Sequence, residues 1–138
     1  MAGLLFLYPK TGLSSTPDQD STEFREGMFL LGEGDYQGAL EKFEAAAKVD
    51  RLNANVYYYL GEVYSELGEY EKATLSYQRS LALNPRQSGE INFKLGLAYY
   101  RIKNYPKAFT ELQKATVYLP EESLGYYYQG LAGFHLKR

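Results

Sequence analysis

One pattern of residues recurs along this chain every 34 or 35 positions. Gly27, Gly61 and Gly96 are each followed by an alanine twelve positions later, and aromatic residues and helix breakers fall in register around these pairs. A period in this range is typical of repeat proteins, in which each unit is one supersecondary element that buries its apolar face only against its neighbours. The period therefore predicts a stack of similar units.

Each unit has the pattern of two helices joined by a short turn. Ala73, Tyr77 and Ser80 are spaced i, i+4 and i+7, which places them on one face of a helix. A glycine inside a helix costs about 1 kcal/mol relative to alanine, so the recurrence of Gly61 needs a packing reason. We expect it to give room to the second helix near Ala73. Breakers mark the predicted turns at Gly34-Asp35, Gly68-Glu69 and Lys103-Asn104.

The sequence therefore predicts an all-α fold. The predicted helices span 21–33, 36–50, 54–67, 70–83, 90–102, 105–118 and 123–136. They form three units at 20–53, 54–87 and 88–122, with an extra residue lengthening the turn near Ser88, and 123–138 forms one extra C-terminal helix. Residues 1–19 form an apolar N-terminal tail and a linker rich in turn-forming residues.

At these positions the chain resembles the tetratricopeptide repeat family, whose pattern is W-x2-L-G-x2-Y…A-x3-F…P. The second unit carries the pattern most fully, in Tyr57, Leu60, Gly61, Tyr64, Ala73, Tyr77 and Pro85. The third unit follows it closely, and the first is degenerate. The resemblance implies a right-handed superhelix of tandem helix pairs, in which the first helix of each pair lines a concave groove that binds peptides or helices of partner proteins.

The groove positions implied by the resemblance are mostly apolar or aromatic, with a few carboxylates. They are Phe24, Met28, Leu31, Tyr58, Glu62, Glu66, Phe93, Leu97, Tyr100, Arg101, Tyr127, Leu131 and Phe134. Exposed apolar stripes of this kind mark interaction sites, so we expect the groove to hold an apolar or amphipathic segment, with a basic residue near Glu62 and Glu66. The alternative is that some of these rings pack between helices, as we expect for Tyr57 and Tyr59.

One subgroup of the family grips the C-terminal carboxylates of chaperones with a clamp of lysine, asparagine and arginine side chains. The corresponding positions here are Phe24, Met28, Tyr59, Glu90 and Lys94. Since only Lys94 carries a suitable charge, the sequence predicts that this chain has no such clamp.

The last predicted helix is apolar around most of its circumference, which is typical of a buried helix. Terminal repeats need a polar outer face for solubility, and no second helix follows to cover Gly130. Three explanations stay open. The chain is a fragment of a longer repeat array, two copies associate through this helix, or the apolar tail around Leu4–Tyr8 covers an exposed surface.

Composition excludes several other functions. The net charge of −2 argues against nucleic acid as a partner. No cysteine and a single histidine, His135, argue against a metal site, and no catalytic or phosphate-binding motif occurs. We therefore expect no cofactor, no metal and no enzymatic activity. The first residues lack the basic start of a secretory signal, and no stretch is long enough to span a membrane, so we expect a cytoplasmic protein.

Three functions remain after these exclusions. The first is a protein–protein interaction module or adaptor, supported by the repeat and the apolar groove. The second is a structural assembly protein whose partner is a second copy, through the C-terminal helix or the N-terminal tail. The third is a regulatory domain of a larger enzyme or transport complex, for which the sequence offers no catalytic residue.

Overall fold

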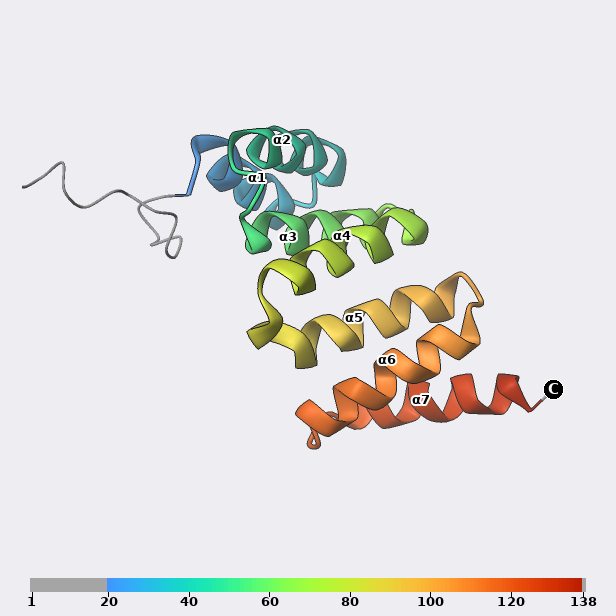
Figure 1. Cartoon of the computed structure of the whole chain (residues 1–138). Helices are drawn as coiled ribbons and strands as arrows, with labels where there is room; N and C mark the ends of the chain where they lie inside the picture. The colour runs from blue at the N-terminus through green and yellow to red at the C-terminus, as the bar shows by residue number, and fades with distance from the viewer. Residues whose placement is uncertain (1–19, 138) are drawn as a thin grey trace, which may run out of the picture.

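The structure of the chain is a computed structural model that describes residues 20–137. In that range it contains α1 (Thr22–Gly32), α2 (Tyr36–Val49), α3 (Ala54–Glu66), α4 (Tyr70–Leu83), the short 3₁₀ turn η3 (Pro85–Gln87), α5 (Ser88–Arg101), α6 (Tyr105–Tyr118) and α7 (Ser123–Leu136), and no strand. Three helix pairs stack one after another, and α7 packs on the last of them (Figure 1). The all-α tandem repeat fold is thus confirmed. The predicted tail lies outside the described residues.

The turn inside each pair repeats the same backbone geometry. Gly34, Gly68 and Lys103 occupy equivalent positions with φ angles of +79°, +76° and +62°. The amide of the residue after each one bonds back to a carbonyl five residues earlier, as Asp35 N does to Leu30 O at 2.9 Å, which is the Schellman ending of a helix. The breaker residues seen in the sequence therefore end the first helix of each pair.

The recurrent glycines form notches that receive a large side chain from the second helix of the same pair. A Cβ added to the glycine would lie 2.8 Å from the ring at Gly27–Phe43, and 2.6 Å from the facing side chain at Gly61–Tyr77 and Gly96–Leu112. Phe43, Tyr77 and Leu112 are almost completely buried. The packing reason expected for the glycines is therefore present in all three pairs.

The connection between the second and third pairs differs from the prediction. The extra residue was expected to lengthen a turn near Ser88, but α5 already begins at Ser88. The connection is instead the 3₁₀ turn η3, in which Asn84 Oδ1 accepts from the amide of Arg86 at 3.2 Å. An asparagine side chain followed by proline favours such a turn, because both restrict the backbone to that geometry.

Candidate binding groove

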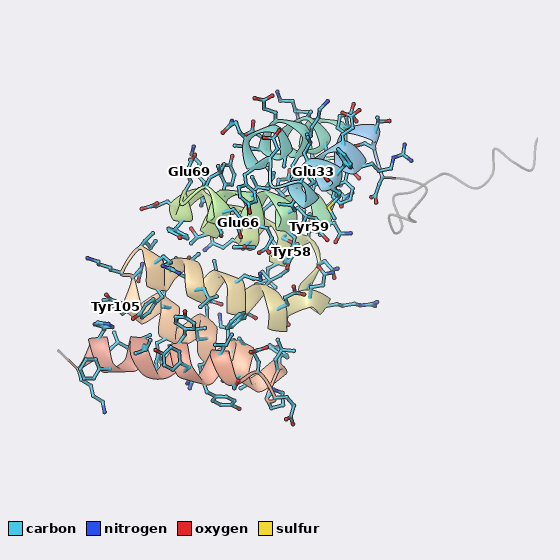
Figure 2. All side chains as sticks on the ribbon, turned by 180° about the vertical axis from the view of Figure 1, so that it is seen from behind. Glu33, Tyr58, Tyr59, Glu66, Glu69 and Tyr105 are labelled. Carbon is cyan, nitrogen blue, oxygen red and sulfur yellow. The ribbon has the colours of Figure 1, made fainter. Side chains whose placement is uncertain are left out.

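Two neighbouring pockets lie along the first helices of the three pairs. The N-terminal pocket has a volume of about 430 Å³ and is lined by Asp20, Phe24, Met28, Asn55, Tyr58, Tyr59, Gln87 and Glu90. The central pocket has a volume of about 370 Å³ and is lined by Glu62, Ser65, Glu66, Tyr70, Tyr77, Lys94, Leu97, Ala98 and Arg101. Both share α3 and α5, and Figure 2 shows Tyr58, Tyr59 and Glu66 along α3.

Packed aromatic rings build the wall of the N-terminal pocket. The ring of Tyr59 stacks on that of Phe43 at a centroid distance of 5.7 Å, and Phe24 meets Tyr59 edge-on at 5.8 Å. Tyr58 in turn meets Tyr59 at 5.2 Å, nearly at right angles. Because Phe43 is fully buried, these contacts tie the pocket wall to the core of the first pair.

Two tyrosine hydroxyls donate to carboxylates along the groove. Tyr58 donates to Glu90 Oε1 at 2.5 Å, and Tyr77 donates to Glu62. Burial is the main reason that the pKa of Tyr58 is raised, and its bond to Glu90 adds to the effect. Burial, followed by the charge of Glu62, likewise raises the pKa of Tyr77. Both hydroxyls therefore remain protonated donors at neutral pH.

The central pocket holds a pair of opposite charges. Lys94 Nζ lies 2.9 Å from Glu62 Oε2 across the gap between α3 and α5, and Tyr77 bonds to the same carboxylate. Glu66 and Arg101 are the other two charged residues of this pocket. The guanidinium carbon of Arg101 lies 5.9 Å from the centroid of the Tyr70 ring. The basic partner residue predicted near Glu62 would therefore meet a carboxylate that already has two partners within the chain.

The structure separates the remaining predicted groove residues. Phe24 is only 6% exposed and belongs mainly to the core. Leu31 packs against the same N-terminal core cluster, while Phe93 is half-buried against the cluster of the third pair. Tyr100 lies among the rings of Tyr105, Tyr128 and His135. These four residues offer a partner less surface than the sequence alone suggested.

The predicted residues on α7 lie in different places. Tyr127 is 59% exposed, and Leu131 is half-buried. Phe134 is 52% exposed and lines an end pocket of about 800 Å³ between α6 and α7, together with Phe109, Gln113, Thr116, Val117, Tyr126, Gln129, Gly130, Gly133 and Lys137. Within residues 20–137, nothing lies within 4 Å of a Cβ built on Gly130. The fourth glycine notch is therefore empty.

Some residues of the pockets were not predicted from the sequence. Asp20 and Gln87 lie in connecting segments, outside the helical pattern that identified the groove. Tyr77 was assigned to the packed face of α4, and only the structure shows its hydroxyl reaching Glu62. Within residues 20–137, no three acidic or histidine side chains come together as metal ligands do, and no helix could cross a membrane.

Comparison with known proteins assigns the family. Models described as tetratricopeptide repeat match residues 54–87 and 91–120, and one described as TPR repeat matches residues 30–68. The chain belongs to the tetratricopeptide repeat family. Proteins of this family and fold are generally protein-interaction modules rather than enzymes, and the matched segments cover the three helix pairs except for most of α1 and the start of α5.

Curated relatives match only in part. The anaphase-promoting complex subunit 3 of Schizosaccharomyces pombe is 32% identical over 81 residues, which are 59% of this chain and 12% of that protein. The photosystem I assembly protein Ycf3 of Rippkaea orientalis is 31% identical over 72 residues, which are 50% of this chain and 42% of that protein. The chain thus spans less than half the length of these relatives.

Solved structures share the fold over most of the chain. A crystal structure of MamA is 28% identical, with a TM-score of 0.77 over 89% of this chain and 71% of that one. The first tetratricopeptide repeat domain of Spaghetti (RPAP3), bound to an HSP90 peptide, is 16% identical, with a TM-score of 0.77 over 84% of this chain and 91% of that one. Both likenesses agree with the observed stack of helix pairs.

Proposed function

We propose that the chain is a non-enzymatic adaptor that holds an apolar or amphipathic segment of another protein along α1, α3 and α5. The observation that carries this proposal is the pair of neighbouring pockets. Tyr58 and Met28 line the first, Leu97 lines the second, and each is only half-buried. Rigid aromatic and aliphatic side chains of this kind supply contact area at low entropic cost.

Structural neighbours support the mode of binding. Spaghetti (RPAP3) is bound to an HSP90 peptide, and PcrH, which is 18% identical with a TM-score of 0.69, is in complex with the chaperone-binding region of PopD. By analogy, we propose a segment of a protein as the ligand here. The proposal includes the absence of cofactor and nucleic acid, and a cytoplasmic location.

The first test is selection of random linear peptides by phage display on the intact chain, followed by affinity measurement. We expect enriched peptides to carry apolar residues. Tyr58→Ala and Leu97→Ala, each in a side chain that lines one of the groove pockets, should reduce their affinity strongly while circular dichroism shows unchanged helicity. Phe29→Ala is the matched control, because Phe29 is 68% exposed and does not line either pocket of the groove. Peptides that bind both groove variants as tightly as the original chain would refute the groove assignment.

Self-association is a second candidate, because α7 leaves the end pocket and the notch at Gly130 open. Its test is sedimentation velocity over a range of concentrations. Val117 is 73% exposed at the end pocket, and Val117→Arg should abolish any dimer. The control Val49→Arg changes a residue that is 65% exposed on α2. A sedimentation coefficient that stays at the value of the monomer over the whole range of concentrations would exclude this candidate.

A further inference from the structure

The two groove pockets differ in their balance of charge. The central pocket has two carboxylates and two basic side chains, and one of each forms the pair Lys94–Glu62. The N-terminal pocket has two carboxylates, Asp20 and Glu90, and no basic side chain among the residues that line it. A pocket with charge of one sign and apolar walls attracts a ligand group of the opposite sign.

The carboxylates of the N-terminal pocket have unused acceptor atoms. Asp20 Oδ1 is buried and has no hydrogen-bond partner within the described residues. Leaving such an atom unsatisfied is unfavourable, and an incoming donor would remove that cost. Glu90 accepts a hydrogen bond from Tyr58 through Oε1. Its Oε2 has no hydrogen-bond partner within residues 20–137. Both groups are therefore suited to a ligand that carries several N–H donors.

Ten of the fourteen tyrosines within residues 20–137 have no basic side chain of the chain over the ring, and Tyr58 and Tyr59 are among them. Four tyrosines elsewhere in the described chain have a basic side chain of the chain itself over the ring. The pairs are Lys72–Tyr64, Arg79–Tyr57, Arg101–Tyr70 and Lys107–Tyr99, with 5.4–5.9 Å between the charged group and the centroid of the ring. Within residues 20–137, no such cation lies over Tyr58 or Tyr59, although both rings line the pocket. Aromatic faces of this kind attract ammonium and guanidinium groups.

The walls of the pocket are held in place before any ligand binds. Tyr59 is fixed by stacking on Phe43, and Tyr58 by its contact with Tyr77 at 6.1 Å and its bond to Glu90. A ligand therefore orders few side chains when it enters, which lowers the entropic cost of binding.

We propose that the N-terminal pocket receives a lysine or arginine side chain of the segment bound in the groove, between Asp20, Glu90 and the rings of Tyr58 and Tyr59. This inference rests on the proposed function and specifies one residue type of the partner. The neighbouring central pocket has as many basic side chains as carboxylates and therefore offers no such excess of negative charge.

The test uses peptides enriched by phage display on the intact chain, synthesised with a fluorophore and measured by fluorescence polarisation. Each peptide is also made with its basic residue replaced by an uncharged residue of similar length, norleucine for lysine or citrulline for arginine. The variants are Glu90→Gln and Asp20→Asn. Glutamine keeps an oxygen that can accept from Tyr58, so Glu90→Gln removes the charge while conserving the local hydrogen bond.

We expect enriched peptides to share a basic residue next to apolar ones. Glu90→Gln should weaken a basic peptide about tenfold or more and leave its uncharged analogue unchanged, since the lost contact is a charge-assisted hydrogen bond. The matched control is Glu41→Gln, which removes the same charge from an exposed position of α2 that lines neither groove pocket and should change both peptides equally little.

The outcomes separate this inference from the proposed function. Enriched peptides without a basic residue, or equal losses for Glu90→Gln and Glu41→Gln, would overturn the inference and leave the adaptor function standing. If selection on the intact chain enriches no peptide at all, the proposed function fails, and the inference fails with it.

Discussion

Replacing Gly61 by alanine tests whether the recurrent glycine is a packing requirement. A Cβ at this position would lie 2.6 Å from Cδ1 and Cε1 of Tyr77. That ring is 1% exposed, and its hydroxyl is held by Glu62. The matched change is Gly130→Ala, at the equivalent position of α7, where no atom of the described residues lies within 4 Å of the added Cβ.

The two substitutions should change stability in opposite directions. Alanine improves helix propensity at both sites by about 1 kcal/mol. Overpacking a buried site typically costs about 1–3 kcal/mol. The cost at Gly61 should lie near the upper end of this range, because the ring of Tyr77 is held in place and cannot move away from the added Cβ. We therefore expect Gly61→Ala to lower the free energy of unfolding by about 2 kcal/mol and Gly130→Ala to raise it by about 1 kcal/mol.

Urea unfolding followed by circular dichroism measures this difference. The protein concentration is kept low, because Gly130 lines the end pocket and self-association would add to its apparent stability. The reasoning is refuted if Gly61→Ala is as stable as the original chain, or if the two variants shift the unfolding midpoint by the same amount in the same direction.

Four further predictions follow from particular contacts. Lys103→Gly should raise the free energy of unfolding by about 0.5–1 kcal/mol in urea titrations, because Lys103 has a φ of +62° that costs an L-residue more than glycine. Ser80→Ala should lower it by about 1–2 kcal/mol, because the buried hydroxyl donates to Ala54 O at 2.8 Å. Burial and a bond to Glu44 raise the pKa of Tyr64 to about 12, so the neutral form is favoured in the folded state. The contribution of neutral Tyr64 to the free energy of unfolding is complete below the unfolded pKa of about 10 and is lost as pH rises towards 12. Tyr64→Phe should flatten this part of the curve of stability against pH. Peptides ending in Glu-Glu-Val-Asp should not bind saturably in fluorescence polarisation, and micromolar binding would contradict the predicted absence of a carboxylate clamp.

The fold was predictable because its determinants are local and repeated. Breakers at Gly34 and Gly68 adopt positive φ, and the same register places Lys103 in that conformation, where its residue type alone would not predict it. Alignment with the other units supplied the missing signal. The start of α5 was placed two residues late, because the proline-initiated turn η3 resembles an ordinary loop in sequence.

The binding groove was less predictable, because its properties depend on contacts between units. The sequence predicted a basic residue of the partner near Glu62, but Lys94 on the next unit, 32 positions along the chain, pairs with this carboxylate. Tyr100 was assigned to the groove from its register, yet rings from α6 and α7 surround it. Asp20 precedes the first helix, and no periodic pattern distinguishes such a position.

Tyrosine shows why residue type alone does not identify the site. The chain has fifteen tyrosines and no tryptophan, and their roles differ with their neighbours. Tyr77 fills a glycine notch, Tyr64 is covered by Lys72, and Tyr58 meets a carboxylate beside an open pocket. A ring already covered by a basic side chain has less of its face to offer a second cation, whereas Tyr58 and Tyr59 have no such cation within residues 20–137 and lie in a pocket with Asp20 and Glu90, which favours a basic partner residue there.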